Sequence, residues 1–294
     1  MNGARIIRLI LYLIRNGRLR HSGYDFAKAR GELLAGVTGF SQAGVTPRAG
    51  KYSSWPSPLR ALASEAAFFR QRLRRQGGHL TLADGRWCYV RVPKAASTSL
   101  CGAVLHQRFP QLDVSALSAE QINAMTDQLL TKSAPAPDQD VFTIVRNPFE
   151  RIVSVYREFF ERRSGHFLYE DYLFGILRPE FTFREFVKAI TMIPDTLKDQ
   201  HFLPQHGLTA FYERKGYVKI VRLEDHDLLR EFLLARGLKM GQLNAGETYD
   251  YRDYYDRGTL EMVNSVYKQD IAHFGYDKEY RALKSIAGHR HVQN

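Results

Sequence analysis

The chain has 294 residues, of which 44% are hydrophobic and 25% charged, so it can form one large α/β domain or two smaller ones with a full core. Its net charge of +11 and sequence pI of about 9.6 favour an anionic partner, such as a nucleotide, an acidic glycan, nucleic acid or a membrane surface. The alternative is that the surplus Lys and Arg only solvate the surface. No readable nucleic-acid-binding motif accompanies the charge, so we expect no nucleic-acid partner.

The N-terminal 76 residues are predicted to form a basic, helical extension, broken at 36–58 by a loop rich in Gly, Ser and Pro. Its most apolar run, at 6–14, includes Arg8 and is much shorter than the roughly 20 residues of a membrane-spanning helix. No small-residue cleavage site follows the run, so we expect neither a transmembrane span nor a signal peptide. A basic amphipathic helix that packs on the domain, or contacts a membrane peripherally, fits this run.

The region 77–285 is predicted to be the functional domain, and 286–294 a tail. The domain opens with a hairpin, because β-rich runs at 80–82 and 87–92 flank the turn dipeptide Asp84-Gly85. Cys88 lies in the second run, and Cys101 is the other cysteine of the chain. Two cysteines without zinc-ligand spacing predict a buried free thiol at Cys88 in reducing surroundings, with a single bridge as the alternative.

Helices alternate with strands through the rest of the domain. Helix patterns cover 98–108, the residues after the capping box at 118–121, those after Pro148 and Thr182, a stretch ending near Gly237, and 259–274. Strand patterns lie at 141–145 and 217–223, and the first is apolar throughout, which is typical of a buried parallel strand. We therefore predict a three-layer, P-loop-like α/β fold with a mostly parallel central sheet and helices on both faces.

The sequence at 87–100, W-C-Y-V-R-V-P-K-A-A-S-T-S-L, has the layout of a phosphate site. A β-rich run leads into Pro93 and Lys94 and then into a helix start that offers amides, hydroxyl groups and one ammonium group to an anion. The pattern is not a Walker A loop, because its lysine precedes the loop and no glycine occurs within it. It predicts a short loop around one terminal phosphate. A plain strand-turn-helix capped by Thr98 is an equal alternative.

Arg146 ends the strand pattern at 141–145 and is followed by Asn-Pro and a helix, so its guanidinium is placed to bind two oxygens of a phosphate. Ser154 lies two helical turns further on and adds a hydroxyl group. Considered without Lys94, Arg146 would be interpreted as an ordinary arginine at the start of a helix. Because ligands of parallel sheets bind at the carboxyl ends of the strands, where Lys94 also lies, the pair favours a phosphate site.

The motifs V-P-K-A-A-S-T-S-L and F-T-I-V-R-N-P-F-E-R-I-V-S-V-Y resemble the two donor-binding motifs of sulfotransferases. The likeness is to sulfotransferase family 2, the carbohydrate O-sulfotransferases of HNK-1 and chondroitin/dermatan 4-O type. It covers about residues 87–276 and includes D-Q-H-F-L-P-Q, V-K-I-V-R-L-E-D and V-Y-K-Q-D-I-A-H-F-G-Y. The resemblance implies in-line transfer of a sulfuryl group from 3′-phosphoadenosine 5′-phosphosulfate (PAPS) to a glycan hydroxyl, as in polysaccharide biosynthesis.

The resemblance also assigns roles to residues of both motifs. The donor's 5′-phosphosulfate is expected in a loop made of Pro93, Lys94, Ala95, Ala96, Ser97, Thr98 and Ser99, with Lys94 on the bridging oxygen. Arg146 and Ser154 are expected to hold the 3′-phosphate, which distinguishes PAPS from ATP. Sulfuryl transfer builds up only modest charge, and no obvious carboxylate motif for Mg²⁺ is present, so no metal is expected.

The general base is expected to be His201, because imidazole titrates near neutral pH and the family pattern has a histidine at this place. A histidine that only orients substrate or caps a helix is an equal alternative. Glu158 is the second candidate base. The alternative is that Glu158 is only a solvated residue of the helix. Glu224 fits an active-site carboxylate or a helix cap, and four tyrosines between 249 and 255 fit a sugar-stacking wall or ordinary packing.

The chain departs from the animal enzymes it resembles, which carry a membrane anchor and several lumenal cysteines. We therefore expect a cytoplasmic, bacterial enzyme that acts on a glycan or a lipid-linked saccharide. The positive net charge of the chain favours an acidic saccharide. A Golgi enzyme without its anchor is the alternative. Two other functions stay open: a non-catalytic module of the same fold that binds nucleotide or anionic glycan, and a P-loop-like kinase.

Overall fold

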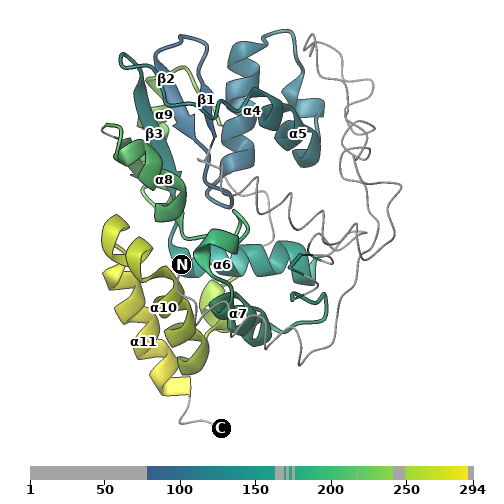
Figure 1. Cartoon of the computed structure of the whole chain (residues 1–294), viewed down its shortest axis with the longest axis vertical. Helices are drawn as coiled ribbons and strands as arrows, with labels where there is room; N and C mark the ends of the chain where they lie inside the picture. The colour runs from purple at the N-terminus through teal and green to yellow at the C-terminus, as the bar shows by residue number, and fades with distance from the viewer. Residues whose placement is uncertain are drawn as a thin grey trace.

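The computed structural model describes residues 78–162, 169, 172–173, 176–216, 218–240 and 249–290. These residues form a mixed α/β domain around a four-stranded sheet with the order β1-β2-β3-β4 (Figure 1). β1 (His79–Thr81) pairs antiparallel with β2 (Trp87–Val90), while β2, β3 (Asp140–Val145) and β4 (Val218–Arg222) run parallel. The expected mostly parallel sheet is confirmed. The extension predicted at 1–76 lies outside the described residues.

Eight α-helices surround the sheet in the described part of the chain. They are α4 (Ser97–Arg108), α5 (Ala119–Leu129), α6 (Pro148–Tyr156), α7 (Phe183–Met192), α8 (Gln205–Glu213), α9 (His226–Leu234), α10 (Arg257–Phe274) and α11 (Asp277–Arg290). A π-helical turn (Arg157–Glu161) extends α6, and 3-10 turns lie at Val114–Ala116, Asp195–Leu197 and Tyr251–Tyr254. α8 and α11 are not predicted from the sequence, and α11 continues past residue 285, the predicted end of the domain.

Helices cover both faces of the sheet. On one face, Tyr89 of β2 and Phe142 of β3 share an apolar cluster with residues of α4 and α9. On the other face, Val90 of β2 and Val218 of β4 pack with Tyr212 of α8. Neighbouring residues of a strand point to opposite faces, so these clusters are the two sides of one sheet. The predicted three-layer arrangement is therefore confirmed.

Turns and helix ends form where local side chains favour them. The dipeptide Asp84-Gly85 turns the chain between β1 and β2, and Gly85 has a φ of 70°, which glycine adopts without steric cost. Ser118 and Thr182 each close a capping box at the start of α5 and α7, as their sequence contexts predict. Gly275 ends α10 in the left-handed conformation.

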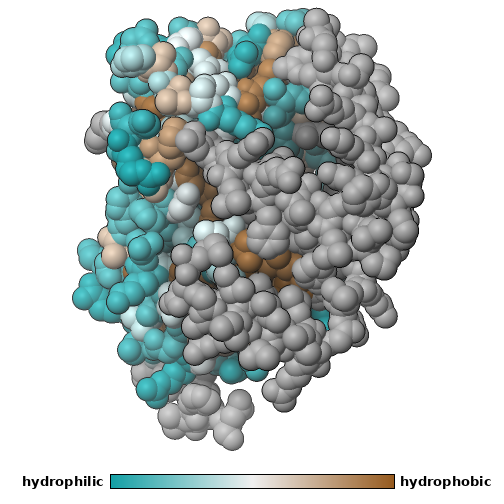
Figure 2. Space-filling model, viewed as in Figure 1, coloured by the Kyte–Doolittle hydropathy of each residue, from teal (hydrophilic) through white to brown (hydrophobic). Residues whose placement is uncertain are grey.

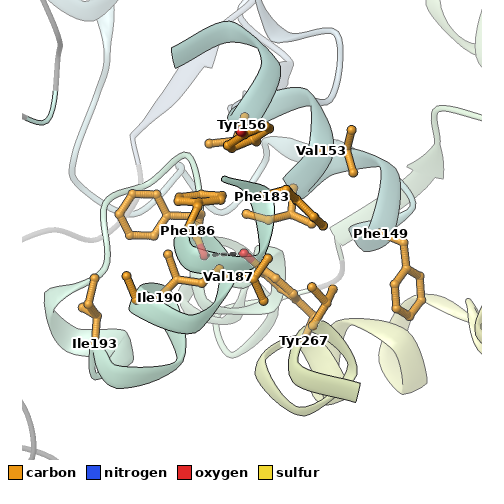
Figure 3. Packing of buried hydrophobic residues seen from close by; sticks show 14 of the residues in the cluster. Phe149, Val153, Tyr156, Phe183, Phe186, Val187, Ile190, Ile193 and Tyr267 are labelled. Carbon is orange, nitrogen blue, oxygen red and sulfur yellow. Dashed lines mark hydrogen bonds between the residues drawn. The ribbon is translucent and has the colours of Figure 1, made fainter. Parts of the chain in front are cut away.

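The largest hydrophobic cluster lies between α6, α7 and α10 (Figure 3). Phe149, Val153 and Tyr156 follow one face of α6, and that face packs toward Phe186 of α7 and Tyr267 of α10. The apolar stripe predicted for this helix is thus a core face. The Tyr267 hydroxyl also donates to the carbonyl oxygen of Phe202 at 2.7 Å, so the core fixes the segment before α8.

The remaining general expectations concern cysteines and membranes. Cys88 is buried and free, as the sequence predicts, and Cys101 is buried and free as well. No helix in the described ranges is long and apolar enough to cross a membrane. Among the coloured residues of Figure 2, hydrophilic side chains gather along the edge where α8, α10 and α11 lie in Figure 1.

Candidate functional site

A pocket of about 680 Å³ lies at the carboxyl ends of β2 and β3. Its walls come from the β2–α4 loop, α5, the residues of α6 and its π-helical turn, and the segment before α8. Residues singled out from the sequence line it: Pro93, Lys94, Ala96, Ser97, Thr98, Ser99, Arg146, Ser154, Glu158 and His201. Ala95 instead points into the core. The volume suits a small-molecule ligand, and the location is the one that parallel sheets use.

The β2–α4 loop presents an uncapped helix start to this pocket. Lys94 and Ala96 have positive φ angles of 68° and 54°, a conformation that costs free energy in residues other than glycine. The N-cap of α4 is Ala96, and no side chain caps the helix, so the interpretation of Thr98 as a cap is wrong. The amides at 97–99 therefore lack intrahelical acceptors, which makes this helix start suitable for an anion.

Lys94 and Glu158 form an ion pair at the pocket. The Lys94 side chain is 14% exposed; burial lowers its pKa, and the Glu158 carboxylate acts in the opposite direction. Glu158 lies on the π-helical turn after α6, next to Phe159, which also lines the pocket. Such turns shift side chains out of α-helical register and are frequent at functional sites. In this structure Glu158 is the counter-ion of Lys94.

Arg146 is fixed through both its backbone and its side chain. Gln205 accepts a hydrogen bond from the Arg146 amide at 2.9 Å and donates one to its carbonyl oxygen at 2.7 Å. The guanidinium donates to the Lys94 carbonyl oxygen at 3.1 Å and to Glu150 at 2.6 Å. Its Nε atom is buried and has no hydrogen-bond partner among the described residues. A positioned guanidinium with an unused donor suits an anionic ligand.

Arg151, which the sequence analysis does not single out, joins two walls of the pocket. Its side chain is almost fully buried, at 1% exposure. The guanidinium donates to the carbonyl oxygens of Pro93, Leu203 and Gln200, each at 2.9 Å. One side chain therefore holds the β2–α4 loop against the segment that carries His201. Burial lowers the pKa of this guanidinium, yet arginine stays charged in proteins.

Asp199 orients the His201 imidazole. The two side chains are 2.6 Å apart, Nδ1 to Oδ1, and the ring nitrogen must be the donor because an ionised carboxylate only accepts. This tautomer leaves Nε2 with a lone pair, as a general base requires. The Tyr169 hydroxyl lies 3.2 Å from both atoms, and the Phe159 ring packs edge-on against the imidazole. This geometry favours a base over a helix cap.

Glu224 and the tyrosines between 249 and 255 do not line the pocket. Glu224 accepts from the Asn147 amide at 2.6 Å and from the Tyr276 hydroxyl at 2.9 Å, so it anchors the start of α6 and does not cap α9. Tyr255 is buried and donates to a core carbonyl oxygen, and the other three tyrosines pack against the same cluster. Packing, not a sugar-stacking wall, is therefore the correct interpretation.

A comparison with protein families matches residues 84–277 to the family described as "Sulfotransferase family". The matched region extends from the hairpin turn to the start of α11 and contains every residue that lines the pocket. No curated protein and no solved structure matches the chain. Because the matched region spans well over half of the chain, this protein belongs to the sulfotransferase family.

Proposed function

We propose that this sulfotransferase uses PAPS as its donor and transfers the sulfuryl group to a hydroxyl of a carbohydrate. The observation that carries the proposal is that two cationic side chains, Lys94 of the β2–α4 loop and Arg146, line one pocket. A donor with phosphate groups at its 5′ and 3′ positions matches both sites. A nucleoside triphosphate matches only the loop, which argues against a kinase.

Different residues of the pocket bind different groups of the donor. The amides at 97–99 bind the 5′-phosphate, and the Lys94 ammonium group stabilises the bridging oxygen as its bond to sulfur breaks. Because the Glu158 side chain is 54% exposed, it can turn to solvent and release Lys94 for this contact. The guanidinium of Arg146 and the hydroxyl of Ser154 hold the 3′-phosphate.

The residues around His201 act on the acceptor. As the bond between the acceptor oxygen and sulfur forms, Nε2 of His201 takes the hydroxyl proton, and Asp199 stabilises the resulting imidazolium. The 3′,5′-bisphosphate leaves with the electron pair of the broken bond. Phe159, which packs on the imidazole, offers an apolar surface beside the acceptor for a sugar ring.

The test is release of adenosine 3′,5′-bisphosphate from PAPS in the presence of neutral and acidic oligosaccharides, with the sulfated product identified by mass spectrometry. Turnover on a glycan hydroxyl supports the proposal, and the contrast between neutral and acidic glycans defines the acceptor class. Turnover confined to phenols or protein tyrosines would overturn the carbohydrate assignment. Donor binding without turnover on any hydroxyl would indicate a non-catalytic module.

Arg146→Ala is expected to weaken binding of adenosine 3′,5′-bisphosphate by roughly 30-fold to several thousand-fold, because a buried charge-assisted contact contributes about 2–5 kcal/mol. Isothermal titration calorimetry measures the change. Adenosine 5′-phosphate, which lacks the 3′ group, is the matched control and should lose much less affinity. Equal losses for both nucleotides would remove Arg146 from the 3′-phosphate site.

His201→Ala is expected to lower kcat by about 10²–10⁴-fold while the affinity for adenosine 3′,5′-bisphosphate stays unchanged, because the base acts only on the acceptor. The exposed His226→Ala variant serves as control. Wild-type turnover in His201→Ala would exclude His201 as base and leave Glu158 as the candidate.

A further inference from the structure

Two histidines and a glutamate meet between α8 and α10, outside the donor pocket. His206 and Glu213 lie two helical turns apart on α8, and His273 comes from the last turn of α10. One ligand atom from each residue lies within 4.8 Å of the other two. Figure 1 shows the two helices next to each other, and none of the three residues lines the pocket. This group is the one such cluster in the described ranges.

Hydrogen bonding in this cluster leaves a buried nitrogen atom unused. His273 Nε2 lies 3.0 Å from a carboxylate oxygen of Glu213, whose other oxygen accepts a hydrogen bond from Thr209. His206 Nδ1 is buried and has no hydrogen-bond partner among the described residues. A buried ring nitrogen without a partner is costly, because it has lost water and gained nothing in exchange. A cation that His206 coordinates through Nδ1, together with Glu213 and His273, would give this nitrogen a partner.

We propose that His206, Glu213 and His273 bind a divalent transition-metal ion, with Zn²⁺ the best match. Two imidazoles and one carboxylate are a donor set that zinc accepts, whereas Ca²⁺ and Mg²⁺ prefer oxygen ligands. Tetrahedral bonds of about 2.0–2.2 Å place neighbouring ligand atoms roughly 3.4 Å apart. Glu213 and His273 are now 3.0 Å apart and all three ligand atoms lie within 4.8 Å of one another, so small side-chain movements would complete the site. Thr209 fixes the carboxylate, as outer hydrogen bonds do at metal sites.

The ion ties α8 to α10 at a contact on which the donor pocket depends. Asp270 of α10 accepts hydrogen bonds from the amides of Gln205 and His206 at the start of α8, at 2.7 and 2.8 Å. Gln205 in turn holds the backbone of Arg146. The metal therefore has a structural role and strengthens this arrangement from outside, without contact with the reacting groups.

The test uses untagged, full-length protein that is stripped with a chelator and titrated with Zn²⁺. The wild type is expected to take up about one additional ion per chain relative to the variants His206→Ala and His273→Asn, measured by mass spectrometry of the bound metal. When the free Zn²⁺ concentration is about a hundred times Kd, the Tm of the wild type should rise by about 5–10 °C. The Tm of the two variants should not rise. Co²⁺ should give a visible spectrum of a four-coordinate ion in the wild type alone.

His226→Ala, which removes an exposed histidine of α9, is the matched control and should keep both the uptake and the rise in Tm. Because the His273 side chain is 40% exposed, His273→Asn is expected to fold, and circular dichroism of the metal-free protein checks this. Equal uptake by the wild type and His273→Asn would overturn the proposal, as would an equal loss in His226→Ala. These readouts do not involve sulfuryl transfer, so they stand apart from the proposed function.

Discussion

Lys94→Ala is expected to lower kcat by about 10²–10³-fold or more, with a much smaller change in the affinity for adenosine 3′,5′-bisphosphate. Negative charge grows on the bridging oxygen only as its bond to sulfur breaks, so the ammonium group contributes chiefly to the transition state. In the ground state, the amides at 97–99 and Arg146 still hold the nucleotide. Turnover at saturating substrates and calorimetric titration of the bisphosphate separate the two effects.

Lys94→Arg is the control for charge, because it keeps a cation but replaces the compact ammonium group with a planar fork. Partial recovery of turnover is expected. Turnover of Lys94→Ala within tenfold of the wild type would remove Lys94 from the bond-breaking step. A loss of nucleotide affinity with an unchanged kcat would instead show that Lys94 binds the ground state as strongly as the transition state.

Glu158→Gln tests the electrostatics of the same pair. Burial lowers the pKa of Lys94 and the Glu158 carboxylate raises it, so removal of that charge should lower the pKa further. Lys94 is active when charged, and kcat/KM is lost as pH rises through its pKa. The alkaline limb of the kcat/KM profile should therefore move to lower pH in Glu158→Gln. An alkaline limb that stays in place would show that another group titrates there.

Much of the fold follows from local signals in the sequence. The turn at Asp84-Gly85 and the capping boxes at Ser118 and Thr182 act within a few residues, so their elements can be predicted without tertiary contacts. α8 is short, and its first turn is held by Asp270, which lies 65 residues away from Gln205 in the chain. α11 is mostly polar and exposed. Neither helix carries a strong apolar stripe of its own.

In the candidate site too, some residues can be predicted from local sequence signals and others cannot. Lys94 and Arg146 could be predicted because each directly follows a β-rich run, where strand ends meet at one edge of the sheet. Asp199 had one usable signal, its position two residues before the candidate base. Arg151 and Gln205 bind main-chain atoms of segments about 50 to 60 residues away. A backbone carbonyl leaves no mark in the sequence, so contacts of this kind appear only in the structure.

Arg151→Lys is expected to lower the free energy of unfolding by about 2–6 kcal/mol. A lysine ammonium group is compact and cannot span three carbonyl oxygens arranged around a guanidinium fork. About two of these buried or part-buried carbonyls then lose their partner, and each loss costs roughly 1–3 kcal/mol. Urea denaturation with an unchanged m-value measures the difference.

Arg230→Lys is the matched control, because its side chain is 68% exposed and paired with Asp227 on the same helix. Its expected cost is below about 0.5 kcal/mol. Affinity for adenosine 3′,5′-bisphosphate adds a second readout, since the Arg151 fork holds the Pro93 carbonyl at the start of the phosphate loop. We expect Arg151→Lys to weaken nucleotide binding and Arg230→Lys to leave it unchanged. A loss of stability with full nucleotide affinity would show that Arg151 supports the core but not the geometry of the loop.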